Sequence, residues 1–361
     1  RTIKIYFLSS FKILCIPGFE SMFEIKKLKI ENKNRNLILK NLDLKYKHYN
    51  ILKFLFHFMP SSYLENFSEY EKAGNKIIPK AGIIYSDANY ISDEIFKIQF
   101  AKLNIKRFIG QHGGNFSIYG KNQINVHESY IADKYILWGK NSESKFNYLP
   151  SPKINLFFLK YKSKLEIKKK KYDFCYILPP LKNTNFSYLF HSLPNNLNLN
   201  ENRFNFFQNI KKNFIIKSYG EENRYNDQVN IQKLPKLFSL NKNKFSKNLK
   251  VIFNSKFLIF DYMSTMIFEI INLRIPFILI LDKKEHNFTK EGIKLYNYLN
   301  KLNILFKNHK QAINFIYSVK DIDEWWYSSK KERILKKISN EFCSLEKNCL
   351  KSWVNFFENS L

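Results

Sequence analysis

Arginine is scarce in this sequence, although the chain as a whole is strongly basic. Lysine and arginine together number 60 against 31 acidic residues, a net charge of +29, but only 7 of the basic residues are arginine. Arginine makes the bidentate contacts to phosphates and bases, and the lysines here are spread along the whole chain. The composition therefore favours a generally solvated lysine-rich surface over a nucleic-acid footprint, which stays open as the less favoured alternative.

Cysteine and long apolar runs are also scarce. The four cysteines form no Cys-x-x-Cys pair and lie far apart in the sequence, at Cys15, Cys175, Cys343 and Cys349. This spacing indicates reduced thiols in a cytoplasmic protein. No apolar run reaches the roughly 18 residues of a membrane span. We therefore expect a cytoplasmic protein. Its basic surface favours anionic substrates and a peripheral position at the inner face of a membrane.

What the sequence does contain is enough apolar material for two domains. Hydrophobic residues make up 45% of the 361 residues and aromatic residues 17%, which excludes a disordered chain. The chain begins at Arg1 without a methionine and resembles neither a signal peptide nor a natural start, so we expect that an N-terminal part is missing.

Short apolar runs alternate with helical patterns along the chain, as in parallel α/β sheets. We expect strands at 80–86, 107–109, 135–138, 172–178, 213–217, 257–260 and 276–281. The apolar spacing predicts helices at 93–103 and 264–273, and the tail from Asp323 onward is helical in pattern. The basic run 164–171 is interpreted as a solvated linker between the two halves.

Glycine is rare, and its distribution marks one loop. Five of the 10 glycines lie between residues 110 and 139, and the segment Gln111-His112-Gly113-Gly114 directly follows a predicted strand. A glycine-rich loop can approach a ligand closely, and His127-Glu128 and Asp133 follow soon after. We interpret His112, Glu128 and Asp133 as candidate catalytic groups. A tight turn with a buried histidine explains the local pattern equally well.

Polar residues also follow the strands of the second half. Ligands of parallel α/β sheets bind beyond the carboxyl ends of the strands. Candidate ligand residues at these positions, together with Gly113 and Gly114, are Lys217, Arg224, Ser264, Thr265 and Glu269. Hydroxyls and N–H groups at a helix start suit an anion, and a carboxylate one turn further along can reach ribose hydroxyls. Taken singly, helix capping explains the two hydroxyls and surface charge explains the two cations; together they favour a nucleotide-sugar or another phosphate ligand.

Several of these motifs, in this order, resemble a bacterial family of transferases associated with O-antigen and other surface-polysaccharide gene clusters. The resemblance covers roughly residues 80–355. It rests on QHGG with Tyr119-Gly120, His127-Glu128, the segment ADKYILWG, Ser264-Thr265 with Glu269, and Trp325-Trp326. The sequence departs from the family pattern at Met263, where asparagine is more usual, and at Ser218, where proline is frequent.

The resemblance implies an α/β fold of the GT-B type, with two Rossmann-like domains facing a cleft and helices at the C-terminus. We expect an acceptor-side domain at 1–163, a nucleotide-donor domain at 172–322, and C-terminal helices at 323–361 that brace the first domain. The implied activity is metal-independent transfer of a sugar from a nucleotide-sugar donor to a glycan or lipid-linked glycan acceptor of a surface polysaccharide, with no resident cofactor. A GT-B-like transferase of polyol phosphate or of a 3-deoxy sugar is the alternative.

Overall fold

A computed structural model describes the part of the chain that carries most of the predicted elements. The described residues are 13–15, 35–37, 54–55, 57–59, 61, 64–69, 72, 82–86, 106–111, 113–114, 117–119, 128–139, 146–165, 170–178, 193–217 and 245–361. The helix predicted at 93–103 lies outside them, as do His112 and Arg224.

The chain folds into two compact units. The first comprises residues 1–110, 127–136 and 350–361, and the second comprises 111–126 and 137–349. This grouping differs from the ranges expected from sequence, since 111–126 and 137–163 belong to the second unit and 350–361 to the first.

Three strands of the first sheet, β2 to β4, lie at predicted positions, whereas β1 and β5 were not predicted from the sequence. The sheet has the order β1 (Ile13–Cys15), β2 (Ile83–Ser86), β3 (Lys106–Gly110), β4 (Lys134–Trp138) and β5 (Asn147–Leu149). Strands β1 to β4 are parallel, with Ile83 beside Lys106 and Phe108 beside Lys134. The boundary between the two units falls within β4.

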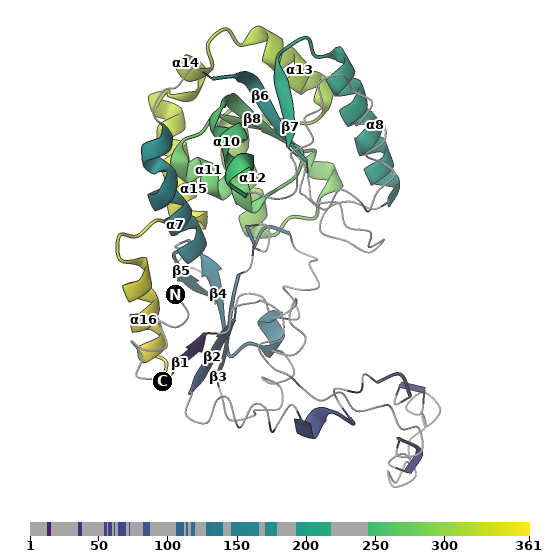
Figure 1. Ribbon diagram of the computed structural model, residues 1–361, viewed down its shortest axis with the longest axis vertical. Coiled ribbons are helices and arrows are strands. Elements are labelled where there is room, and N and C mark those ends of the chain that lie inside the picture. The colour runs from purple at the N-terminus through teal and green to yellow at the C-terminus, as the bar shows by residue number, and fades with distance from the viewer. Residues whose placement is uncertain are drawn as a thin grey trace. The chain divides into compact units, whose positions relative to one another are not determined.

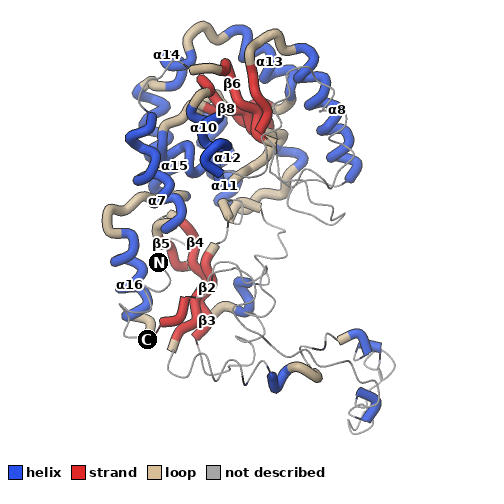
Figure 2. Tube along the Cα trace, in the orientation of Figure 1, coloured by secondary structure: helices blue, strands red, loops and turns tan. Residues whose placement is uncertain are grey.

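The last helix of the chain, α16 (Cys349–Glu358), packs on the first unit (Figure 2). Its aromatic side chains meet those of the sheet, with ring centroids 5.0 Å apart for Tyr85 and Trp353 and 5.8 Å for Phe108 and Phe357. The Lys134 side chain donates to the hydroxyl of Ser360, 2.7 Å away. Helix α16 thus contributes to the same core as the strands of the first sheet, in the first unit.

The second sheet is entirely parallel and confirms the predicted α/β class. Its order is β10 (Leu305–Phe306), β9 (Phe277–Ile280), β8 (Ser255–Phe260), β6 (Tyr172–Ile177) and β7 (Phe214–Lys217). Its strands read as continuous apolar runs, because helices cover both faces and alternate side chains are buried on either side.

Two hydrophobic cores lie on the two faces of this sheet, beneath the helices that Figure 1 shows on either side of it. Alternation along β6 sends Cys175 and Ile177 to one core and Phe174 and Tyr176 to the other. Helices α8 (Leu193–Asn209) and α13 (His309–Ser318) cover the second of these faces. The other face is covered by α7 (Pro152–Tyr161), α10 (Phe245–Phe253), α11 (Thr265–Leu273), α12 (Lys290–Lys301) and α15 (Ser329–Phe342).

Short helical segments complete the second unit. These are η2 (Lys162–Leu165), η4 (Lys283–Glu285) and α14 (Ile322–Trp326). The last of them carries the tryptophan pair: the Trp326 indole donates to the backbone carbonyl of Arg274 (2.8 Å) and packs on the Phe277 ring.

Candidate functional site

Helix α11 begins at the carboxyl end of strand β8, as predicted. Ser264 is its N-cap, and the serine hydroxyl accepts a hydrogen bond from the backbone N–H of Met266 (3.2 Å). The helix ends at Arg274 in the left-handed conformation, with φ of 58°. Its remaining side chains are buried from Met266 to Leu273, including the only acid, Glu269. An almost wholly apolar helix therefore carries one carboxylate into the interior, one turn from its start.

The carboxylate of Glu269 is influenced by the positive charges of two lysines. The carboxylate is only 7% exposed, and burial raises its pKa, while the positive charges of Lys153 on α7 and Lys217 act in the opposite direction. Lys217, the last residue of β7, is itself 4% exposed, and burial lowers the pKa of its ammonium against the attraction of Glu269. Strand alternation places Lys217 on the same face of the sheet as Cys175.

The glycine-rich loop packs against the first turn of α11. The backbone N–H of Gly114 donates to the hydroxyl oxygen of Thr265 (3.0 Å). Gln111 fixes the loop from the other side, since its amide nitrogen donates to the carbonyl of Gly113 (2.7 Å) and its amide oxygen accepts from the N–H of Trp138 (2.9 Å). The structure thus brings Gly113, Gly114 and Thr265 together.

The glycine at position 114 is required by this close approach. A methyl group there would lie 2.3 Å from the Phe268 ring and 3.2 Å from the Cα of Thr265. We expect Gly114→Ala to lower the free energy of unfolding by about 1–3 kcal/mol, the usual effect of overpacking, as measured by urea denaturation. A double-mutant cycle with Phe268→Leu should show favourable coupling, because the smaller side chain makes room. Wild-type stability in the single variant would contradict the packing.

A second polar cluster lies on the opposite face of the same sheet. Asp261, the residue after β8, accepts from the Arg203 guanidinium of α8 and, at 2.8 Å, from the hydroxyl of Tyr176. The same tyrosine oxygen lies 2.9 Å from Nε2 of His309, the first residue of α13. All four side chains are at least nine-tenths buried.

The protonation states of this cluster follow from its surroundings. Burial acts to raise the pKa of Asp261, but the charge and hydrogen bond of Arg203, together with His309 and the hydrogen bond from Tyr176, outweigh it, and the pKa lies below its ordinary value. Burial lowers the pKa of His309 to about 4, so this imidazole is neutral at pH 7. Because the single proton of Tyr176 goes to the ionised Asp261, we assign the proton of His309 to Nε2, which leaves Nδ1 as an acceptor.

Sequence reasoning missed three members of this cluster. Tyr176, Arg203 and His309 lie in an apolar strand and in two helix patterns that gave no local sign of a site. Only Asp261, directly after a predicted strand, stood at a position where ligands bind in such sheets.

The other predicted acidic residues lie in the first unit. Glu128 is 1% exposed on a helical turn at 128–131, and its carboxylate accepts from the hydroxyl of Tyr135 (3.3 Å). Asp133 is exposed and accepts from the backbone N–H of Arg107 (2.6 Å), at the amino ends of β3 and β4. Asp133 therefore links the amino ends of these two strands, and its catalytic role stays a prediction.

Neither a metal-binding cluster nor a membrane-spanning helix is present among the described residues. Within them, no three His, Cys, Asp or Glu side chains are grouped so that they could hold a metal ion. None of the helices in that part of the chain is long and apolar enough to span a membrane.

Comparison with known proteins places the chain in a family. A family model described as "LIC12162 family transferase" matches residues 3–357. No curated protein sequence gives a significant match. Among solved structures, MurG of Acinetobacter baumannii is similar, with 10% identity over 82% of this chain and 78% of MurG and a TM-score of 0.48.

Two other solved structures are similar at the same low level. The UDP-GlcNAc 2-epimerase of Methanocaldococcus jannaschii has 13% identity over 76% of this chain and 81% of its own, with a TM-score of 0.46. The wall teichoic acid polymerase TagF has 14% identity over 82% and 75%, with a TM-score of 0.39. Because the family model spans nearly the whole sequence, the protein belongs to the LIC12162 family of transferases.

Proposed function

We propose that this transferase moves a sugar from a nucleotide-activated donor to a glycan or lipid-linked glycan acceptor of a cell-surface polysaccharide. The observation that carries the proposal is the start of α11 at the carboxyl end of a parallel sheet, where Gly114 donates to Thr265 and the buried charges of Glu269 and Lys217 influence each other. Family membership supplies the transferase chemistry, and the GT-B arrangement and the surface-polysaccharide pathway belong to the proposal.

The start of α11 suits the phosphates of such a donor. A helix N-terminus carries about half a positive charge and N–H groups without partners inside the helix. The Thr265 hydroxyl accepts from Gly114 and still has its own proton to donate. The buried ammonium of Lys217 supplies positive charge, and Arg224 is proposed to add to it. Gly113 and Gly114 are proposed to let the backbone approach the ligand.

Glu269 is proposed to bind the ribose of the donor. A carboxylate accepts from the two neighbouring hydroxyls of a ribose, and Glu269 lies four residues after Thr265, hence on the same side of the helix one turn further on. Its second role is to balance the charges of Lys153 and Lys217 when no donor is bound. His112 and Glu128 are proposed as the acid and base groups acting on the acceptor, with no metal ion required.

Glu269→Ala tests the donor site. We expect the variant to weaken nucleotide binding by about 1.5–3 kcal/mol, the range for hydrogen bonds to a charged group. A thermal-shift screen of CMP, UDP, GDP and ADP first identifies the nucleotide, because a ligand at about 100 times its Kd adds about 2.7 kcal/mol of stability. Calorimetry with that nucleotide then compares the variant with the wild type.

Two controls accompany this measurement. Ser264→Ala should weaken binding less than Glu269→Ala, because its hydroxyl already caps the helix and the backbone donors remain. Glu332→Ala, on the exposed surface of α15, should leave the affinity unchanged. If the nucleotide binds Glu269→Ala as tightly as the wild type, the donor lies elsewhere and α11 belongs to the core alone.

A further inference from the structure

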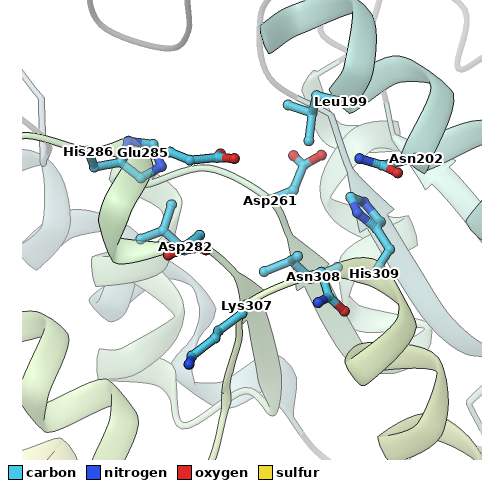
Figure 3. A pocket seen from close by; sticks show the side chains of 11 residues that line it. Leu199, Asn202, Asp261, Asp282, Glu285, His286, Lys307, Asn308 and His309 are labelled. Atoms are coloured by element: carbon cyan, nitrogen blue, oxygen red, sulfur yellow. The ribbon is translucent and has the colours of Figure 1, made fainter.

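A pocket of about 220 Å³ lies at the carboxyl ends of β8, β9 and β10, on the face of the second sheet that α8 and α13 cover (Figure 3). Asp261, already part of the buried cluster, lines its floor. The other polar residues that line it are Asn202, Asp282, Glu285, His286, Lys307, Asn308 and His309. None of these seven was identified as a ligand residue from the sequence.

Asp261 lines this pocket, and one of its carboxylate oxygens has no donor among the described residues. Its Oδ2 accepts from both Arg203 and Tyr176, whereas its Oδ1 is buried and no described residue donates to it. The side chain as a whole is 2% exposed. In Figure 3 the Asp261 carboxylate points toward the space between Asn202 and Glu285. A buried carboxylate oxygen is unfavourable until a donor reaches it, so this atom calls for a hydrogen-bond donor on a ligand.

The lining selects the chemistry of that ligand. Acceptors dominate it: the orphaned Asp261 oxygen, the Nδ1 of His309, and the carboxylates of Asp282 and Glu285 at the rim. The lining holds the two carboxylates of Asp282 and Glu285 against one lysine, Lys307, which makes it an unsuitable place for a phosphate. Asn202 and Asn308 offer amides that both donate and accept. Such a lining suits an uncharged group with several hydroxyls.

The size of the pocket narrows the choice further. Its volume is below the range of about 300–1,000 Å³ that is typical of sites for drug-sized ligands. One sugar ring is a better match for it than an oligosaccharide.

We propose that this pocket binds one sugar ring, whose hydroxyls donate to Asp261 Oδ1 and His309 Nδ1. The inference rests on the proposed function, since it supplies that function with its sugar subsite. Asp261 precedes Ser264 by three residues, and three residues span at most about 11 Å even when fully extended. A donor with its phosphates at the start of α11 could therefore place its sugar here. The sugar could equally be a unit of the acceptor glycan, and the experiment separates the two sources.

The experiment compares two neighbouring asparagines of α8. Asn202 lines the pocket and Asn205 does not, and both side chains are exposed, so neither replacement disturbs the core. Asn202→Leu should narrow the pocket and remove its amide, and Asn205→Leu is the matched control. Asp261→Asn replaces the orphaned carboxylate directly, and circular dichroism reports whether it still folds.

The first probes are methyl glycosides of glucose, galactose, mannose and N-acetylglucosamine, and saturation-transfer NMR measures their binding. The second probes are the nucleotide from the thermal-shift screen and its sugar esters, measured by calorimetry. We expect Asn202→Leu to weaken a glycoside or a nucleotide-sugar at least about fivefold, the effect of losing one or two hydrogen bonds, and to leave the free nucleotide unaffected. Asn205→Leu should bind every probe as the wild type does.

The same measurements show whether the sugar belongs to the donor or to the acceptor. They also test the sugar pocket independently of the proposed transferase function. Weakened nucleotide-sugar binding in Asn202→Leu assigns the pocket to the donor, and a glycoside that still binds beside saturating nucleotide-sugar assigns it to the acceptor. If a glycoside binds in an Asn202-dependent way but the protein binds no nucleotide, the pocket is a sugar site and the proposed function is wrong. If Asn202→Leu and Asn205→Leu bind all probes alike, the pocket is not a sugar site, whatever the nucleotide does.

Discussion

Replacing Asp261 by alanine is expected to lower the free energy of unfolding by about 3–5 kcal/mol. This is the range observed when one partner of a buried ion pair is removed and the other charge stays in the interior. Here the remaining charge would be the Arg203 guanidinium, which is 1% exposed, and the hydroxyl of Tyr176 would lose its acceptor as well. Urea denaturation of the variant beside the wild type measures the difference.

Two further variants show whether the loss comes from the buried charge. The exposed pair of Glu332 and Lys336 is only 3.0 Å apart, yet Glu332→Ala should leave the urea midpoint close to that of the wild type, because water screens the pair. The double variant Asp261→Leu with Arg203→Met should recover much of the loss, since it removes both charges together. A single Asp261→Ala variant that unfolds at the wild-type urea concentration would show that Arg203 reaches solvent.

Replacing His112 by alanine or Glu128 by glutamine is expected to reduce turnover by about 10²–10⁴, the usual contribution of a positioned acid or base. Nucleotide affinity should be unchanged in both variants, because neither group is assigned to the donor. Release of the nucleotide from the nucleotide-sugar, with acceptor present, measures the rate.

The structure supplies a competing explanation for Glu128 that the same variants test. Its carboxylate is buried and accepts from Tyr135, so it also has a structural role. If that role is its only one, Glu128→Gln will melt at a lower temperature while the folded fraction keeps normal turnover. Tyr135→Phe removes the same hydrogen bond without touching the carboxylate, and it should lower stability while leaving turnover within about a factor of ten of the wild type.

The sequence alone determined the central strands of the second sheet and helix α11, whereas strands β1, β5 and β10 and helices α7, α8, α10, α12 and α13 were not predicted. Strands β6, β7, β8 and β9 coincide with the apolar runs predicted at 172–178, 213–217, 257–260 and 276–281, because a strand covered on both faces has to be apolar throughout. Helix α11 was predicted at 264–273, since Ser264 is a good cap and its side chain can satisfy a backbone N–H of the first turn. These signals act between residues that are close in sequence.

Only the tertiary structure decided which of these residues meet. The contact between Gly114 and Thr265 joins positions 151 residues apart, and no local pattern specifies it. The buried polar cluster draws its members from two strand ends and two helices. The parallel sheet brings these four residues together at the carboxyl ends of its strands: Tyr176, Arg203, Asp261 and His309. The position of Asp133 was likewise decided by the packing: it precedes strand β4 and accepts from the Arg107 N–H at the amino end of the sheet. Distant contacts depend on how strands and helices pack, and the polar groups that the packing buries must find partners there.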